Sequence, residues 1–323
     1  MFAVYADSIN PESPLDGLVV GERPDPDVPE GWTTVTVKAA SINHHDVWSL
    51  RGVGLRAESL PMILGCDAAG LDEDGNEVLV HAVINEPDWR GDDTIDPKRS
   101  LLSERYQGTF ADKVTVPRRN VVAKPAGLSF AEAACLPTAW LTAYRMLFTQ
   151  SGLKQGESVL IQGAGGGVAT AAITLARAAG FRVYATSRDE DKRAKAVEIG
   201  AHEAFESGAR LPAKVDAVIE TVGAATWSHS IKSMRPGGTI VIAGATSGDA
   251  PKAAELTRIF FQQMRVHGST MGTRDELHAL AQFMDVSGIR PLIDREIPME
   301  DAAEGLKSII DGSVFGKIVL TRG

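Results

Sequence analysis

The sequence predicts an α/β protein in which a parallel sheet, covered by helices on both faces, is inserted into a β-rich domain. Short strands between Gly, Pro and Asp residues fill the first third of the chain. After Ser129, apolar strands of Val and Ile alternate with helices, which is typical of a parallel sheet. The last helix and strand return the chain to the first domain. We therefore assign 1–124 and 292–323 to the β-rich domain and 125–291 to the inserted domain.

The β-rich domain is defined by short β-branched strands between turn residues. We expect strands in TTVTVKAASI (33–42) and NEVLVHAVI (76–84), and two more in FADKVTVPRRNVVAKP (110–125). A helix near the C-terminus carries an apolar face formed by Ala302, Leu306, Ile309 and Ile310. The closing strand is GKIVLTRG (316–323).

The inserted domain begins with a helix whose start is marked by a capping box between Ser129 and Glu132. The strand SVLIQG (158–163) is followed by a helix of small residues, which ends at Gly180 as a C′ glycine would end it. The strand RVYATS (182–187) is followed by a second helix. Further strands are VDAVIET, TIVIAG and VHGST.

The composition is that of an ordinary globular protein, with 44% hydrophobic and 23% charged residues. The formal net charge of −9 repels nucleic acid and anionic lipid, so neither is expected as a partner. The N-terminus lacks the pattern of a signal peptide, and no uncharged apolar run is long enough to span a bilayer. Two cysteines cannot build a disulfide framework. We expect a cytoplasmic protein whose partner is a small molecule.

The strongest functional signal is SVLIQGAGGGVA (158–169), in which a strand runs through a glycine turn into a helix. Gly163, Gly166 and Ala169 follow the spacing G-x-x-G-x-x-A. A pyrophosphate needs backbone N–H groups at a helix N-terminus with no Cβ in the way, and a final small residue lets the helix pack closely on the strand. Together with the repeated strand–helix units, this turn predicts a Rossmann domain that binds a nicotinamide dinucleotide.

The end of the second strand favours NADPH over NADH. An NAD site usually presents Asp or Glu about 20 residues after the glycines, where the carboxylate accepts a hydrogen bond from the ribose 2′-hydroxyl. Ser187 stands there instead, followed by Arg188, with Lys192 and Arg193 on the next helical turn. Basic side chains can pair with a 2′-phosphate. The alternative is that these residues form only the solvated start of a helix.

The chain resembles the medium-chain dehydrogenase/reductase superfamily, in particular its zinc-independent quinone oxidoreductase-like branch. The matching segments span nearly the whole chain: AASINHHDVWSLRG (39–52), LPMILGCDAAG (60–70), GTFADKVTVP (108–117), LSFAEAACLPTAWLTAYRML (128–147), VLIQGAGGGVA (159–169) and GKIVL (316–320). The resemblance implies a GroES-like β-rich catalytic domain formed by both chain ends. It also implies a Rossmann domain with a six-stranded parallel sheet.

The resemblance further implies roles for single residues. Asn43 and Asp46 match the Asn-x-x-Asp of the catalytic loop. Trp48 stands where many relatives carry a tyrosine, and it either stacks on a flat substrate or packs the loop. His44 is the preferred polar group near the reacting oxygen, unless it binds only the ribose or the backbone. With the glycine turn and Arg188 included, the residues expected to contact the dinucleotide are Thr142, Gly163, Gly166, Gly167, Val168, Ser187, Arg188, Lys192, Val222, Ala243, Gly244, Met271, Gly272 and Lys317.

A zinc ion is not expected, and no residue is assigned to a metal. Zinc-dependent relatives use a Cys-His-Cys set, whereas the matching positions here are Asn43, Cys66 and Thr138, and only Cys66 offers a soft ligand. The segment that matches the lobe of the structural zinc, 83–108, has no cysteine. His44 and its neighbour His45 are expected in an extended loop, where adjacent side chains point in opposite directions.

The expected activity is hydride transfer from NADPH to a quinone, enone or aldehyde without a metal. Quinones and α,β-unsaturated carbonyls suit this chemistry best because their oxygen can take up the developing charge. Two alternatives stay open: a zinc-containing alcohol dehydrogenase, and a relative that binds NADPH with little turnover. The family suggests a homodimer formed through edge strands. VHGST (266–270) is the candidate edge, although a short edge strand can also be blunted and leave a monomer.

Overall fold

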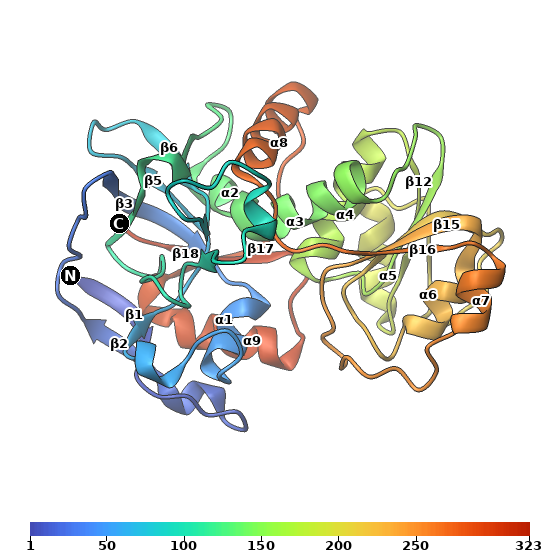
Figure 1. The fold of residues 1–323 in the computed structure, drawn as a ribbon, viewed down its shortest axis with the longest axis horizontal. Helices are drawn as coiled ribbons and strands as arrows, with labels where there is room; N and C mark the ends of the chain where they lie inside the picture. The colour runs from blue at the N-terminus through green and yellow to red at the C-terminus, as the bar shows by residue number, and fades with distance from the viewer. The chain divides into compact units, whose positions relative to one another are not determined.

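The computed structural model describes residues 1–323 and divides into two compact units. The first unit contains Met1–Leu141 and Gly272–Gly323, so both chain ends contribute to it. The second unit contains Thr142–Met271. Each unit holds its own sheets and helices, many of which are labelled in Figure 1. None of the helices has both the length and the apolar character that spanning a bilayer requires.

The units divide at other positions than the boundaries at 124/125 and 291/292 that the sequence suggests. Helix α2 (Phe130–Ala134) packs against strands β3 and β5 of the first unit. Helix α8 (Arg274–Ser287) packs against β10 of the same unit. Helix α2 precedes the alternating strands of the inserted domain and α8 follows them. Neither helix differs in composition from the helices between those strands, so periodicity alone does not reveal which sheet each one covers.

The first unit is built on β-sheets. The largest sheet has seven strands in the order β10–β6–β5–β3–β18–β17, with β9 paired to β3. Its strands are β3 (Trp32–Ser41), β5 (Ala68–Leu71), β6 (Glu77–Val80), β9 (Lys113–Pro117), β10 (Val121–Ala123), β17 (Ile293–Pro298) and β18 (Lys317–Thr321). The smaller sheets combine β1 (Phe2–Ala6) with β2 (Leu18–Glu22) and β4 (Met62–Ile63), and β7 (Val83–Ile84) with β8 (Ser100–Leu101). Because β18 pairs with β3, the last strand completes a sheet that the N-terminal segment begins, as predicted.

Helices and short turns cover these sheets. The helices are α1 (His44–Leu50), α2, α8 and α9 (Ala302–Asp311), and a π-helical turn, η5 (Leu136–Trp140), follows α2. Single turns of 3-10 helix are η1 (Pro14–Gly17), η2 (Ala57–Ser59), η3 (Asp93–Ile95), η4 (Arg118–Asn120) and η7 (Met299–Asp301). The predicted capping box is confirmed, because Ser129 Oγ accepts from the backbone N–H of Glu132 at 3.1 Å and Glu132 Oε2 accepts from that of Ser129 at 2.8 Å.

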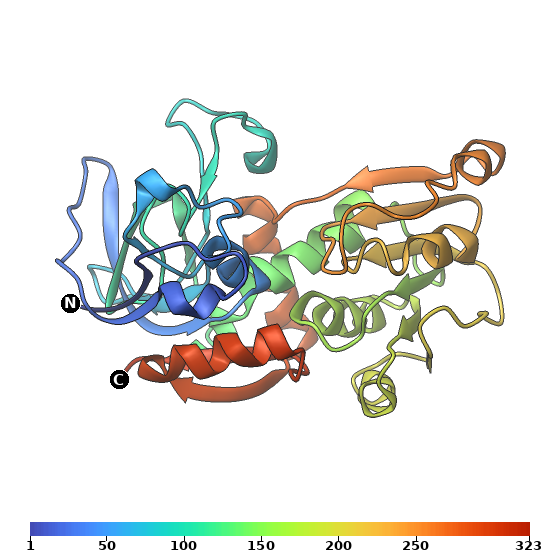
Figure 2. The ribbon, with the colours of Figure 1, turned by 90° about the horizontal axis from the view of Figure 1, so that it is seen from below.

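Two details of the first unit differ from the prediction. Figure 2 shows α9 alongside the last strands, and its buried face contains Ala302 and Leu306, whereas Ile310 is 38% exposed and lies outside that face. The predicted strand 76–84 is broken between β6 and β7. At the break, the N–H of His81 donates to the carbonyl of Asn120 and the Asn120 side chain donates back to the His81 carbonyl, both at 2.8 Å. A side chain distant in sequence therefore replaces the ladder there.

The second unit is a six-stranded parallel sheet, as predicted. Its order is β13–β12–β11–β14–β15–β16, and every neighbouring pair is parallel. The strands are β11 (Ser158–Ile161), β12 (Arg182–Thr186), β13 (Glu203–Phe205), β14 (Val215–Glu220), β15 (Met234–Ile242) and β16 (Arg265–Gly268). The helices are α3 (Leu141–Tyr144), which begins at the unit boundary, then α4 (Gly167–Ala178), α5 (Glu190–Glu198), α6 (Trp227–Ser233) and α7 (Leu256–Phe261), with a π-helical turn η6 (Arg145–Gln150).

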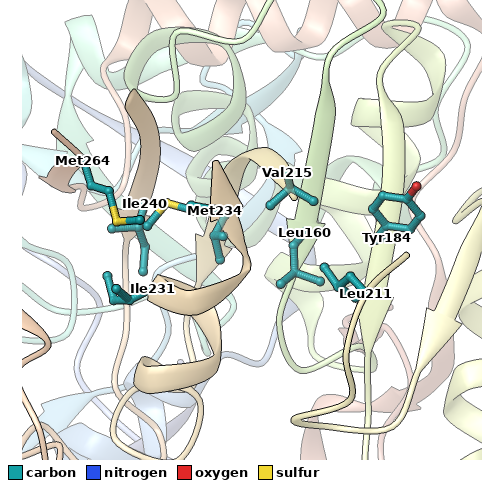
Figure 3. Close-up of a cluster of buried hydrophobic side chains, with 9 residues drawn as sticks. Leu160, Tyr184, Leu211, Val215, Ile231, Met234, Ile240 and Met264 are labelled. Atoms are coloured by element: carbon teal, nitrogen blue, oxygen red, sulfur yellow. The ribbon is translucent and has the colours of Figure 1, made fainter. Parts of the chain in front are cut away.

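The core of the second unit lies between the sheet and its helices. Leu160 of β11, Val218 of β14 and Ile240 of β15 are completely buried and belong to one cluster with Ile231 of α6. Figure 3 shows Ile231 beside Ile240. Side chains of neighbouring parallel strands bury both faces of the sheet, which explains their continuous apolar runs. Helix α4 ends before Gly180, which has φ of +81° and confirms the predicted C′ glycine.

Candidate active site

The predicted catalytic loop is a helix. Asn43 is the N-cap of α1 with an extended backbone (φ −126°, ψ 160°), and Asp46 Oδ2 accepts from the backbone N–H of Asn43 at 2.8 Å. The carboxylate thus satisfies a donor at the helix start. The expectation of an extended loop around His44 and His45 is wrong. Consecutive helical residues still point about 100° apart, so the two imidazoles diverge.

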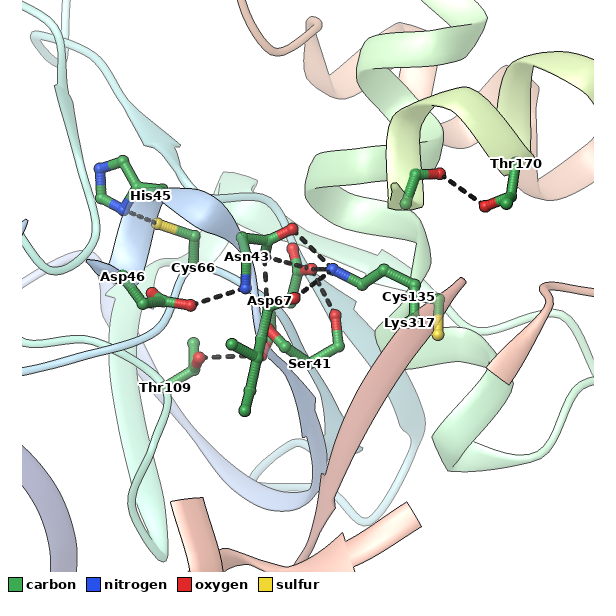
Figure 4. Close-up of polar contacts among 12 residues, drawn as sticks. Ser41, Asn43, His45, Asp46, Cys66, Asp67, Thr109, Cys135, Thr170 and Lys317 are labelled. Atoms are coloured by element: carbon green, nitrogen blue, oxygen red, sulfur yellow. Dashed lines mark hydrogen bonds and ion pairs between the residues drawn. The ribbon is translucent and has the colours of Figure 1, made fainter. Parts of the chain in front are cut away.

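A buried network joins α1 to the last strand (Figure 4). Lys317 of β18 is 2% exposed, and its Nζ donates to the carbonyl of Ile42 at 2.7 Å and to Asn43 Oδ1 at 2.6 Å. The same Nζ lies 3.4 Å from Oδ2 of Asp67, which is fully buried. Asn43 Nδ2 and Ser41 Oγ also donate to this oxygen, at 2.8 and 2.6 Å. The ammonium therefore balances a carboxylate that would be costly to bury alone.

This network engages two residues that the sequence assigns to ligands. Besides its bond to Asp67, Asn43 Nδ2 lies 3.3 Å from the carbonyl of Ser41, so both amide hydrogens have protein acceptors. The ammonium of Lys317 has three oxygen partners within the first unit. In this arrangement the side chains of Asn43 and Lys317 bind other residues of the first unit and hold the start of α1 against β18. A direct contact of Asn43 with substrate, or of Lys317 with the dinucleotide, stays a prediction.

His45 and Cys66 form a second polar cluster, which the sequence does not select as a site. The His45 ring contacts Glu104 Oε1 through Nε2 at 3.0 Å and Cys66 Sγ through Nδ1 at 3.4 Å. Burial opposes the charged form of His45, but Cys66 and Glu104 outweigh it and raise the pKa of the ring well above its usual value. The cluster ties α1 to the segment that carries Glu104.

The other predicted residues of α1 differ in exposure and ionisation. His44 is exposed at the surface of α1. Two effects lower the pKa of its ring: the larger is partial desolvation by the surrounding protein, and the smaller is the positive charge of Lys317. Asp46 is fully buried, and desolvation raises its pKa to about 6. Trp48 is half-buried, and the guanidinium of Arg51 lies 5.2 Å from its ring centre. A cation on the ring supports the packing interpretation of Trp48 more than free stacking on a substrate.

The glycine turn of the second unit has the backbone that a pyrophosphate site needs. Gly163 and Gly165 have φ of +73° and +130°, and Gly166 is the N-cap of the 12-residue helix α4. A Cβ on Gly163 would lie 2.6 Å from Cγ2 of Val222, so the predicted residue Val222 packs directly on the turn. A Cβ on Gly166 would meet nothing within 4 Å, which leaves the helix N-terminus, with Gly167 and Val168 as its first residues, open on that side.

The end of β12 gathers the residues predicted to select the dinucleotide. Ser187 is 7% exposed and its Oγ accepts from the backbone N–H of Asp189 at 3.2 Å. Arg193 donates to the carbonyls of Ser187 and Arg188, at 3.0 and 3.2 Å, so it fixes the backbone of the loop. The stem of Lys192 lies over Gly165, whose Cβ would be 2.9 Å from Cδ of the lysine. The structure thus brings Lys192 to the glycine turn, and the backbone N–H of Ala164 in that turn donates to the carbonyl of Thr186, the residue before Ser187, at 2.7 Å.

The remaining predicted contacts fall at strand ends and at the unit boundary. Ala243 follows β15 and donates through its backbone to the carbonyl of Glu220 at 3.0 Å, and Gly244 comes next. Thr142 lies in α3 and is 6% exposed. Met271 has φ of +51°, and the following residue, Gly272, accepts a hydrogen bond at 2.9 Å from Nε2 of His81, a buried residue that the sequence does not select.

Comparisons with known proteins agree with this architecture. An alcohol dehydrogenase GroES-like domain matches residues 29–126, and a zinc-binding dehydrogenase domain matches residues 167–285. The chain is 28% identical to the acryloyl-coenzyme A reductase of Sulfurisphaera tokodaii, over 95% of this chain and 97% of that protein. It is also 28% identical to the quinone oxidoreductase of Lama guanicoe, over 88% and 87%.

A solved structure gives the decisive likeness. The crystal structure of an NAD-dependent alcohol dehydrogenase superposes with a TM-score of 0.91 at 32% identity, and the match covers 100% of both chains. The chain belongs to the medium-chain dehydrogenase/reductase superfamily. It lies in the quinone oxidoreductase-like branch of that superfamily and is an oxidoreductase.

The residues of this medium-chain dehydrogenase/reductase do not fit a catalytic zinc. Cys66 is buried, and its thiol donates to the carbonyl of Leu102 at 3.1 Å, so its sulfur is already engaged within the protein. Asn43 already accepts from the ammonium of Lys317, so a divalent ion beside it would meet a fixed positive charge. Thr138 offers only a hydroxyl. The three matching positions therefore supply a single soft ligand, which does not make the ligand set of a zinc site.

Proposed function

We propose that the protein transfers hydride from NADPH to a quinone or an α,β-unsaturated carbonyl without a metal. The observation that carries this proposal is the buried ion pair of Lys317 and Asp67. The ammonium of Lys317 donates to Asn43, which stands at the position where zinc-dependent relatives have a metal ligand. An unactivated alcohol would need help to lose its proton, whereas a conjugated acceptor takes up hydride directly. The names of the two curated relatives, a quinone oxidoreductase and an acryloyl-coenzyme A reductase, describe conjugated acceptors of this kind.

The side chains of α1 suit a supporting role in this reaction. Bound NADPH would supply a hydride from C4 of its nicotinamide. His44 is exposed and its lowered pKa keeps the imidazole neutral near pH 7, so the ring can donate one N–H hydrogen bond to an acceptor oxygen. Asp46 is buried and holds the N–H of Asn43, so it acts by fixing the start of the helix. The proton that completes the reduction then comes from water.

The preference for NADPH rests on the end of β12. Ser187 takes the place where a carboxylate would repel a 2′-phosphate, and Lys192 lies over the glycine turn beside it. Arg188 is exposed and adds a second positive charge at the same loop. These three residues give the 2′-phosphate a polar and basic setting. The similar alcohol dehydrogenase is described as NAD-dependent, so NADH is the competing cofactor in the test.

One experiment tests activity, cofactor and metal together. Oxidation of NADPH and NADH is followed against a panel of quinones, enones and aldehydes, and zinc is measured in the same purified sample. The proposal expects turnover of conjugated acceptors, faster with NADPH, in protein with far less than one zinc per chain. Stoichiometric zinc with alcohol oxidation would instead identify an alcohol dehydrogenase. Tight NADPH binding without turnover of any acceptor would indicate a non-catalytic relative.

We also propose that the protein forms a homodimer through β16. This strand is the last of its sheet and pairs only with β15, so its outer backbone groups are open to another strand. Val266 of β16 is 43% exposed, and Phe260 and Phe261 of the preceding helix are 65% and 73% exposed. Exposed aromatic side chains beside an open edge support a second copy as the partner.

A further inference from the structure

A buried polar network lies beneath the dinucleotide turns of the second unit. Gln162 directly follows β11, precedes Gly163, and is 1% exposed. Its Nε2 donates to Nδ1 of His229 and to Oγ of Ser230, both at 2.9 Å. Its Oε1 accepts from the hydroxyl of Thr186, the last residue of β12. The amide therefore links the end of β11 to the end of β12 and to helix α6.

The imidazole of His229 fixes the orientation of this amide. His229 Nε2 lies 2.8 Å from the carbonyl of Ala209, which can only accept, so Nε2 carries the hydrogen. Nδ1 is then the acceptor for Gln162 Nε2. Since the amide nitrogen faces His229, the amide oxygen must face Thr186. Both polar atoms of the Gln162 side chain thus have assigned partners, two for Nε2 and one for Oε1.

Glu220 continues the network to the end of β14. It is fully buried, and its carboxylate accepts from Oγ of Ser230 at 2.6 Å and from Oγ1 of Thr226 at 2.9 Å. It also accepts from the backbone N–H groups of Val222 at 2.8 Å and Gly223 at 3.0 Å. Hydroxyls and backbone amides therefore surround a buried carboxylate and hold the turn that packs on Gly163.

The network members share one placement in the sequence. Gln162 directly precedes Gly163, and Thr186 directly precedes Ser187. Glu220 stands two residues before Val222. Each buried group thus supports a residue expected to face the dinucleotide. Buried and fully satisfied polar networks favour one arrangement of the segments that they join. The network therefore fixes the distance between the pyrophosphate turn and the end of β12.

We propose that Gln162 is a positioning residue that sets the preference for NADPH over NADH, with Glu220 as its anchor; this inference rests on the proposed NADPH dependence. Both dinucleotides use the glycine turn, but only NADPH needs Ser187 held at the position of a 2′-phosphate. Loosening the link between Gln162 and Thr186 moves the end of β12 relative to the turn. Binding of NADPH then weakens more than binding of NADH.

Two variants of the full-length chain test this inference. Gln162→Glu keeps the shape of the side chain but replaces the donor that faces His229 and Ser230 with an acceptor. Thr186→Val removes only the hydroxyl that binds Gln162, because the valine side chain has the same shape as that of threonine. Fluorescence titration with NADPH and NADH gives both dissociation constants. We expect the Kd for NADPH to rise about tenfold and that for NADH about threefold or less, since one or two buried hydrogen bonds are lost.

A matched control lies at the opposite end of the same strands. Asp216 Oδ2 accepts from the backbone N–H and the hydroxyl of Ser158, both at 2.7 Å, and so also links β14 to β11. Asp216→Asn should lower stability without changing the ratio of the two Kd values. The turnover number at saturating NADPH should stay within about twofold in Thr186→Val, because the reacting groups are untouched.

The outcomes separate this inference from the function on which it rests. A wild-type protein without NADPH preference overturns both the proposed cofactor and the role of Gln162. A wild-type preference that survives in Gln162→Glu and in Thr186→Val overturns only the role of Gln162. The same change of ratio in Asp216→Asn also overturns it, because the effect would then follow from general destabilisation of the sheet.

Discussion

The replacement Lys317→Met tests whether the buried ammonium holds the first unit together. The side chain of Lys317 is 2% exposed, and that of Asp67, 3.4 Å away, is completely buried. Met is similar in length but cannot donate, so the carboxylate of Asp67 loses its counter-charge and Asn43 Oδ1 loses its donor. Removing one partner of a buried ion pair costs about 3–5 kcal/mol. We expect the free energy of unfolding to fall by that amount.

The double variant Lys317→Met/Asp67→Asn separates the charge from the packing. With both charges gone, no unpaired ion remains, and neutral replacements of buried pairs are often close to neutral in stability. The double variant should therefore be more stable than the single one. A surface control is Lys307→Met on α9. The ammonium of Lys307 lies 2.5 Å from Oδ2 of Asp311, and the two side chains are 64% and 49% exposed. That change should cost less than about 0.5 kcal/mol.

Urea unfolding at constant pH measures all three proteins. A loss of about 1 kcal/mol or less in Lys317→Met, similar to the surface control, would refute the ion-pair argument. A double variant less stable than the single one would also refute it, because Asp67 would then contribute without the lysine. Both outcomes would remove the main argument against a cation site beside Asn43.

Three further predictions use other parts of the molecule. Ser187→Asp combined with Arg188→Leu should raise the Kd for NADPH by about tenfold or more and spare NADH, since a carboxylate repels the 2′-phosphate; fluorescence titration would show a retained NADPH preference if this is wrong. The pKa of Asp46 is raised to about 6. The stability that its neutral form contributes is therefore fully present below about pH 4 and is lost as the pH rises through 6. Relative to Asp46→Asn, the wild type should lose about 3 kcal/mol of unfolding free energy over that range, and a constant difference in urea unfolding would contradict this. Val266→Asp should convert a dimer to a monomer in light scattering, whereas Val286→Asp on α8, at a residue 89% exposed, should not.

The alternation of strands and helices was predictable because it depends on local patterns. The strand before Gly163, the helix after it and the C′ glycine at Gly180 follow from apolar runs and turn residues. The start of α1 was missed for a related reason. Asn43 and Asp46 have the spacing of a capping pair, although the family match of Asn-x-x-Asp implied a loop. The local signal for a helix start was therefore present in the sequence.

The partners of the site residues were not predictable in the same way. Lys317 binds Asn43 across 274 positions of sequence, and His81 binds Gly272 across 191. Neither pair has a periodic pattern, because the contact is created by the sheet that brings the two segments together. The sequence suggested that Lys317 contacts the cofactor and did not indicate Asp67 as its partner. A tertiary contact of this kind needs the fold before it can be seen.

One sequence feature nevertheless marks where such contacts occur. Gln162 follows the apolar strand SVLI, Glu220 ends VDAVIE and Lys317 opens KIVL, and each of the three is at most 2% exposed. A polar group at the end of an apolar strand is carried into the interior by the sheet, where it must find a partner or pay the full cost of desolvation. Its presence therefore predicts a buried polar contact but not the identity of the partner. In this chain the three contacts lie next to Gly163, Val222 and Asn43, so the same feature also indicates which strand ends form the site.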